Sequence, residues 1–182
     1  MSDSLPVFRY HADPIATGSI VSSPKVCRRC ERRRGYIYVG PVYGDGELDE
    51  AFCPWCIADG SAATELDAEF TDPDGVGDHG SWDAVPPDVV DEVSQRTPGF
   101  SGWQQERWWT HCADAAVFLG RAGRRELEER WAAAIPALMM EAGMEGETWR
   151  DYAAALDAHG SPTAYVFRCT RCGALGGYSD CH

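Results

Sequence analysis

The sequence lacks any apolar run of about eighteen residues, the length that a membrane-spanning helix requires. Its first residues, Met1-Ser2-Asp3-Ser4-Leu5-Pro6, also lack the basic start and the apolar stretch of a secretory signal. We therefore expect no membrane-spanning segment and a cytoplasmic location. Hydrophobic residues make up 44% of the 182 positions, which is enough for a packed core, so disorder over most of the length is not expected.

The common catalytic signatures are missing as well. The sequence shows no Ser-His-Asp set, no phosphate-binding glycine loop and no HExxH motif. A binding protein is therefore expected in preference to an enzyme.

Basic residues are absent from a long segment. Between Gly35 and Gln95 there is no Lys or Arg, whereas fifteen Asp or Glu residues occur. Just before this segment, six cations fall within residues 25–34. An acidic segment repels phosphates and attracts basic proteins, in a chain whose net charge is −13. The alternative is that the acidity only keeps the protein in solution.

Cysteine is the residue whose spacing is most informative. Six of the eight cysteines form three CxxC pairs, Cys27/Cys30, Cys53/Cys56 and Cys169/Cys172. In a reducing compartment, clustered cysteines bind metals or catalyse reactions more often than they form disulfides. Scattered core cysteines would not be expected to repeat one spacing three times, so metal binding is the leading interpretation.

The segment Phe52-Cys53-Pro54-Trp55-Cys56 has two interpretations. A Cys-Pro-aromatic-Cys sequence can present a reactive thiolate, as in glutaredoxin-like enzymes, but this requires a buried strand before the first cysteine. An acidic turn over residues 43–50 precedes it instead, and carboxylates raise the pKa of a thiol. The other CxxC pair lies twenty-two residues upstream, close to the spacing of zinc ribbons. We predict a closed structural Zn²⁺ site formed by Cys27, Cys30, Cys53 and Cys56.

The third CxxC pair, Cys169 and Cys172, supplies half of another site. Candidates for the remaining ligands are Cys112, His111, Cys181, His182 and His79. Adjacent residues bind one metal only with unusual geometry; our first choice is nevertheless a second zinc site of Cys169, Cys172, Cys112 and His111. Asp114 either orients a ligating histidine or caps a helix. The alternative is that Cys112 is an ordinary buried cysteine and the last pair binds no metal. The isolated His11, His79 and His159 are expected to be structural or on the surface.

The hydrophobic pattern predicts an α+β fold, in which a short antiparallel sheet carries zinc-ribbon-like cysteine knuckles and several helices cover it. Expected strands are 7–10, 36–39, 163–167 and a short one near Tyr178. Expected helices are 56–70, 87–95, 124–141 with a kink at Pro136, and 147–159. Segment 115–119 is either a strand or a helix turn, and 71–84 is a loop. Residues 1–70 form an arm and a zinc-ribbon-like module, and 71–182 an α+β domain with the last knuckle, unless both are one continuous domain.

Three segments resemble a known family. "CPWCIADGSAA" (53–63), "RTPGFSGWQQERWWTHCADAAVFLG" (96–120) and "YVFRCTRCG" (165–173) are similar to the CbrC family, and "LPVFRYHADPIATGSI" (5–20) fits its opening. The resemblance implies a small cytoplasmic bacterial protein with metal-binding cysteines, whose name is attached to tolerance of colicins. Its motif positions correspond here to Cys27, Cys30, Cys53, Cys56, His111, Cys112, Asp114, Cys169 and Cys172. Cys181 lies outside the family's usual pattern, so it is a less favoured candidate for a metal ligand.

These observations together predict a zinc-binding protein, with one Zn²⁺ at the first site and a second at the other. The acidic stretch is expected to engage a basic partner protein, such as a bacterial toxin. One alternative is a zinc-ribbon regulator that contacts nucleic acid through Arg28, Arg29 and Arg32–Arg34. Another is a metal-dependent enzyme that uses the second zinc site, with His111 or Asp114 as acid or base.

Overall fold

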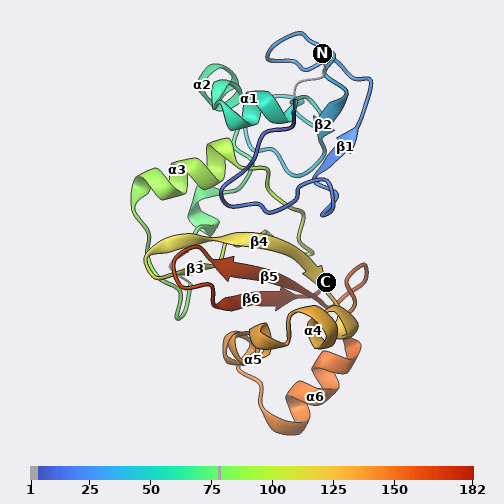
Figure 1. The fold of residues 1–182 in the computed structure, drawn as a ribbon, viewed down its shortest axis with the longest axis vertical. Helices are drawn as coiled ribbons and strands as arrows, with labels where there is room; N and C mark the ends of the chain where they lie inside the picture. The colour runs from blue at the N-terminus through green and yellow to red at the C-terminus, as the bar shows by residue number, and fades with distance from the viewer. Residues whose placement is uncertain (1–3, 78) are drawn as a thin grey trace. The chain divides into compact units, whose positions relative to one another are not determined.

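The computed structural model describes residues 4–77 and 79–182; residues 1–3 of the expected arm and residue 78 of the expected loop lie outside the described residues. Figure 1 shows the chain, which separates into two compact units. The first unit holds the residues up to Val76 together with Pro87–Ser101, and the second holds Gly77–Pro86 and Gly102–His182. The predicted division of the chain near residue 70 stays a prediction.

A two-stranded antiparallel sheet and short helices make up the first unit. Strand β1 (Ile20–Ser22) pairs with β2 (Tyr36–Tyr38), so the strand expected over 36–39 is confirmed. Residues 7–10 form no strand, although Phe8 and Tyr10 are buried. The helices are α1 (Pro54–Ala58), α2 (Ser61–Leu66), η1 (Pro73–Gly75) and α3 (Pro87–Arg96).

The helix expected over 56–70 is therefore two short helices. Gly60 separates them with a φ of 76°, and Asp67 ends α2 with a φ of 50°, so the chain leaves the right-handed helical conformation at both points. Phe70 then packs edge-to-face against both Phe52 and Tyr38. These contacts put the segment that carries Cys53 against the core of the unit.

The second unit contains a four-stranded antiparallel sheet. Its strands are β3 (Thr110–His111), β4 (Asp114–Ala122), β5 (Thr163–Cys169) and β6 (Leu175–Asp180), in the order β3-β4-β5-β6. Segment 115–119 is thus part of a strand, and the strands expected at 163–167 and near Tyr178 are confirmed. The hairpin partner β3 was not predicted.

Helices α4 (Arg124–Arg130), η2 (Ala132–Ala134), α5 (Ile135–Ala142) and α6 (Gly146–Ala155) cover one face of this sheet (Figure 1). The helix expected over 124–141 breaks at Trp131, whose φ is −132°, and Pro136 lies in the first turn of α5, where its missing N–H costs nothing. Leu138 and Trp149 pack on the β5 residues Ala164 and Val166 from the helical side.

The opposite face of the sheet is aromatic. Tyr165 and Tyr178 are paired across β5 and β6 and stack with ring centroids 4.8 Å apart, and Trp108 lies 5.8 Å from Phe167. Both faces of β5 are therefore buried. The predicted α+β class with antiparallel sheet and covering helices is confirmed. No helix that the structure describes is long and apolar enough to cross a membrane.

Candidate metal centres

The first CxxC pair lies on a tight turn of the first unit. The backbone N–H of Glu31 donates to the carbonyl of Cys27 at 2.8 Å, and the N–H of Cys27 donates to the carbonyl of Arg32 at 3.0 Å. Glu31 has a φ of 52°, a left-handed conformation that reverses the chain directly after Cys30. This turn directs two sulfur atoms, three residues apart, to the same side.

The second pair lies at the start of α1. Cys53 is the N-cap residue, and Pro54 follows in the first turn, where proline is well tolerated. The backbone N–H of Cys53 also donates to Cys27 Sγ at 3.3 Å, so the two pairs are joined before any metal is considered. Cys56 is one helical turn further on and is 3% exposed.

Four sulfur atoms converge here, and we call this group site 1: Cys27, Cys30, Cys53 and Cys56. Their Sγ–Sγ distances are 3.8 Å for Cys27–Cys56, 3.9 Å for Cys30–Cys53 and 3.6 Å for Cys53–Cys56. A tetrahedral Zn²⁺ with Zn–S bonds of about 2.3 Å separates its sulfur ligands by roughly 3.8 Å. The sulfur atoms of site 1 therefore already have the spacing that a tetrahedral metal requires.

Hydrogen bonding and burial make several thiolates at site 1 costly in the absence of a cation. The Cys53 thiol donates to Cys27 and lowers the pKa of Cys27 to about 4, while the same bond, together with burial, raises the pKa of Cys53 far above its ordinary value. Burial also raises the pKa of Cys56 to about 12. Ionisation of more than one of these buried thiols is therefore unfavourable. A divalent cation would compensate the additional negative charges.

The basic residues around the first turn are engaged by carboxylates and backbone. Lys25 forms an ion pair with Glu50, and Arg29 forms one with Glu65. The guanidinium of Arg28 donates to the carbonyl of Glu47 at 2.9 Å. The acidic segment therefore takes up part of the basic cluster within the chain itself.

The third CxxC pair, in the second unit, repeats the turn of the first. The N–H of Gly173 donates to the carbonyl of Cys169 at 3.1 Å, and the N–H of Cys169 donates to the carbonyl of Ala174 at 2.8 Å. Gly173 has a φ of 77° and takes the place that Glu31 has in the other turn. Two backbone N–H groups, from Arg171 and Cys172, point at Cys169 Sγ at 3.4 and 3.5 Å.

A two-residue hairpin turn between β3 and β4 supplies the other half of this group. His111 pairs with Asp114 across the strands, and the two central residues, Cys112 and Ala113, have φ values of 58° and 53°. Positive φ at both central positions is what a type I′ turn requires. This backbone is the unusual geometry that lets adjacent residues face one site: His111 Nδ1 lies 3.2 Å from Cys112 Sγ and 3.5 Å from Cys172 Sγ.

We call the resulting group site 2: His111, Cys112, Cys169 and Cys172. Its four ligand atoms lie within 4.8 Å of one another, as do those of site 1. Burial opposes ionisation of the Cys169 thiol, but the N–H groups of Cys172 and Arg171 and a hydrogen bond from His111 outweigh it and lower its pKa to about 6. The hydrogen bond to Cys172 raises the pKa of Cys112 to about 11. One sulfur of site 2 is thus ready to bind a cation as a thiolate near neutral pH.

Neighbouring side chains fix the orientation of site 2. The ring of Trp109 stacks on that of His111, with centroids 5.3 Å apart and planes 17° apart. Asp114 is fully buried; its Oδ2 accepts from Thr170 Oγ1 at 2.8 Å and from Arg171 Nε at 3.1 Å, which ties β4 to the cysteine turn. Asp114 begins a strand, so the expectation that it caps a helix was wrong. It supports the Cys169 turn through Thr170 and Arg171.

The other predicted ligand candidates do not belong to either group. His182 packs against Trp103 with the ring planes tilted by 53° and the centroids 4.1 Å apart, and His79 lies edge-on to Trp82 at 5.5 Å. Cys181 is exposed. The alternative that Cys112 is an ordinary buried cysteine was wrong, because Cys112 is exposed beside Cys172 and His111. Trp109 is a functional neighbour that the sequence did not single out, because no local motif relates it to His111.

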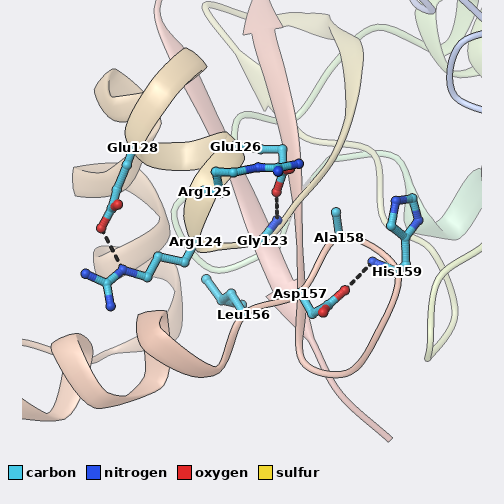
Figure 2. Close-up of a pocket in the computed structure, with 9 residues that line it drawn as sticks. All are labelled: Gly123, Arg124, Arg125, Glu126, Glu128, Leu156, Asp157, Ala158 and His159. Carbon is cyan, nitrogen blue, oxygen red and sulfur yellow. Dashed lines mark hydrogen bonds and ion pairs between the residues drawn. The ribbon is translucent and has the colours of Figure 1, made fainter.

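A cleft of about 430 Å³ lies apart from the metal-ligand groups, at the start of α4 (Figure 2). Its charged side chains are engaged: Arg124 pairs with Glu128 at 2.7 Å, and Glu126 accepts from the N–H of Gly123 at 3.0 Å. Asp157 likewise accepts from the N–H of His159 at 2.7 Å. The cleft therefore offers no group prepared for chemistry comparable to that of the cysteine clusters.

Comparison with known proteins gives a family match. Residues 5–181 match the family described as "Uncharacterised protein family (UPF0167)". A UPF0167 protein of Mycobacterium bovis is 50% identical over 184 residues, covering 97% of this chain and 93% of its own. A UPF0167 protein of Pseudomonas aeruginosa is 42% identical over 174 residues, covering 95% of both. No solved structure matches the chain.

Proposed function

Because this chain belongs to the uncharacterised protein family UPF0167, we propose its function from its two metal-ligand groups: it is a zinc-binding protein, not an enzyme, whose acidic first unit binds a basic partner protein. The observation that carries the proposal is the convergence of four ligand atoms in each group. Cys27 and Cys56 are far apart in sequence, as are Cys112 and Cys172, yet each set lies within 4.8 Å.

The ligand types favour zinc. Thiolate and imidazole are soft or borderline ligands, which suit Zn²⁺, whereas Mg²⁺ and Ca²⁺ prefer oxygen. Site 2 offers one nitrogen and three sulfurs, a set common in structural zinc sites. Iron is the other metal that four thiolates hold, so metal analysis distinguishes the two.

The number of ligands argues against a catalytic metal. Each site provides four protein atoms, which complete the tetrahedral shell of zinc. Zinc enzymes usually leave one position open for water or substrate. The alternative of a metal-dependent enzyme with His111 as acid or base therefore loses support, because His111 is itself a member of site 2.

The charges of the first unit support a basic partner. Its exposed carboxylates include Asp45, Glu47, Asp49, Asp59, Asp67, Asp74, Asp88 and Asp91. The cations Lys25 and Arg29 are already paired with Glu50 and Glu65. The unit thus presents an excess of negative charge, which favours association with a basic protein and disfavours nucleic acid. The resemblance to the CbrC family makes basic toxins of the colicin type our first candidates.

Metal analysis tests the first part of the proposal. We expect elemental analysis of the purified chain to find about two zinc ions per chain, and Cys53→Ser and Cys169→Ser each to lose about one. Cys181→Ser, which changes an exposed cysteine outside both groups, is the matched control and is expected to keep both. A chain that binds no metal and melts cooperatively after chelation would overturn the proposal.

Binding to a panel of basic nucleases tests the second part. We expect affinity to fall with added salt, and to fall further when Asp45, Asp49 and Asp67 are changed to Asn. The control changes three exposed acids of the second unit, Glu145, Glu147 and Asp151, to their amides. An affinity that does not change with salt, or an equal loss of affinity in both variants, would contradict an acidic docking surface. Retention of RNA or DNA in place of protein would favour the nucleic-acid alternative.

A further inference from the structure

Two of the three sulfur atoms in site 2 face the solvent. Cys112 and Cys172 are exposed, and only Cys169 is buried, at 3%. Site 1 differs: Cys27 and Cys53 are fully buried, Cys56 is 3% exposed, and Cys30 alone is half-buried. A reagent in solution can therefore reach two neighbouring sulfurs at site 2 and not at site 1.

Hydrogen bonding separates the same two sulfurs from the third. Cys169 Sγ accepts N–H groups from Arg171 and Cys172, at 3.4 and 3.5 Å. Among the described residues, no backbone N–H donates to the sulfur of Cys112 or Cys172; their polar neighbour is His111 Nδ1, itself a member of site 2, at 3.2 and 3.5 Å. Donors to a sulfur withdraw electron density from it, so the two exposed sulfurs keep more of their nucleophilic character.

The positions of the two sulfurs also suit a bond between them. Both lie within the 4.8 Å cluster, and each is on a surface turn, one at the tip of the β3–β4 hairpin and one between β5 and β6. Joining them moves turns and leaves the buried strands in place. The Cys169 thiol donates to the carbonyl of His111 at 3.5 Å, and its sulfur accepts two backbone N–H groups. Cys169 is therefore held in the core.

We propose that site 2 is an oxidant-reactive centre in which a hydroperoxide converts Cys112 and Cys172 into a disulfide and releases the metal. The inference rests on the proposed zinc occupancy of site 2. One exposed thiolate attacks the outer oxygen of the hydroperoxide; the O–O bond breaks, an alcohol or water leaves, and a sulfenic acid forms. The second thiolate then attacks that sulfur, the S–S bond forms, and hydroxide leaves as water after protonation. Two electrons pass from the sulfurs to the peroxide.

Loss of these two ligands dismantles the site. Only His111 and Cys169 remain, and two ligands do not hold zinc as four do. The β3–β4 hairpin is then linked to the Cys169 turn by a covalent bond in place of the metal. Site 1, whose sulfurs are mostly buried, keeps its ion. Oxidation therefore changes one unit of the protein and leaves the other unchanged.

The test treats the zinc-loaded full chain with hydrogen peroxide and measures released zinc with a chromogenic chelator. We expect about one zinc per chain to appear, a peptide map that joins Cys112 to Cys172, and recovery of binding after thiol reductant and fresh zinc. Cys112→His keeps a zinc ligand but removes the thiol, so release is expected to slow at least about tenfold. Cys181→Ser, which removes an exposed thiol outside the cluster, is expected to behave as the parent.

Three outcomes would overturn the inference while the proposed function stands: zinc retained at site 2 under peroxide, equal release from both sites, or a map that joins Cys169 to Cys172. A reduced chain that carries no zinc at site 2 before peroxide is added would instead overturn the proposed occupancy, and the inference with it. Metal content is therefore measured on the reduced chain first.

Discussion

Glu31 and Gly173 occupy the same position in two turns of the same design, each directly after the second cysteine of a CxxC pair and each with a positive φ, 52° and 77°. In both turns the N–H of this residue donates to the carbonyl of the first cysteine, at 2.8 and 3.1 Å. The two units thus use the same backbone turn to place two sulfurs where one metal ion could bind them. They use different residues at its strained position.

The first prediction concerns Gly173. Replacing it with alanine adds a side chain that meets no atom within 4 Å, so the cost comes from the left-handed backbone alone. We expect Gly173→Ala to weaken zinc binding at site 2 by about 1 kcal/mol, roughly fivefold. A chelator competition titration measures it. Zinc at site 1 is the internal control, and Glu31→Gly is expected to leave site 1 no weaker.

The second prediction concerns the β3–β4 turn. Ala113 has a φ of 53° where type I′ turns favour glycine, and a β-branched residue is disfavoured there. We expect Ala113→Gly to strengthen zinc binding at site 2 about two- to fivefold and Ala113→Val to weaken it by a similar factor. The same titration on both variants checks the order. A valine variant that binds as well as the glycine variant would show that backbone strain at this turn does not control the site.

This turn also shows where sequence reasoning stops. The CxxC spacing singled out six of the eight members of the two groups, because a CxxC turn is local and its ligands are identified by residue type. His111 and Cys112, in contrast, were a choice among several candidates. Whether adjacent His111 and Cys112 can face one metal depends on a hairpin turn that Cys-Ala does not signal. The turn is also bonded to a residue that is distant in sequence, because the backbone N–H of Ala113 donates to Asp83 Oδ2 at 2.9 Å.

The helix boundaries illustrate the same limit. Regular apolar spacing over 124–141 predicted one helix, but the chain breaks at Trp131, where its N–H still bonds back to Glu126 and Leu127. The break allows α4 and α5 to cover the sheet separately, and it depends on the core they share with Ala164 and Val166. Helical periodicity shows which side chains are buried, whereas tertiary packing decides where the helix ends.

The third prediction concerns Gly176, which faces the ring of Trp109. A Cβ at Gly176 would lie 2.4 Å from that ring, closer than any real contact, and Trp109 in turn stacks on His111. We expect Gly176→Ala to displace Trp109 and His111 and to weaken zinc binding at site 2 by about five- to 150-fold, because overpacking costs about 1–3 kcal/mol. Zinc release, measured separately for each site, checks it. Equal weakening of site 1 would indicate general unfolding in place of a local effect.

The last prediction concerns pH and the buried His11 of the first unit. Its Nδ1 lies 2.7 Å from the carbonyl of Pro98 and its Nε2 2.7 Å from Thr17 Oγ1, and burial lowers its pKa to about 4 although the Pro98 carbonyl and Asp13 oppose the shift. Between pH 6.5 and about 4 the unfolded chain therefore binds a proton that the folded chain does not. Above pH 6.5, neutral His11 makes its whole contribution to the free energy of unfolding. As the pH falls from 6.5 to about 4 this contribution is lost, which lowers the free energy of unfolding by about 3 kcal/mol in total.

Substituting His11 with glutamine removes this titration. We expect His11→Gln to be less stable than the parent at pH 7, because it fills the buried site less well, and to lose less stability between pH 7 and pH 4. Urea unfolding of both proteins across this range measures the difference. Acid also protonates the cysteine ligands, but it does so in both proteins, so the difference between the two curves reports His11 alone. Parallel curves would show that the folded and unfolded chains protonate His11 alike, and that its burial carries no pH-dependent stability.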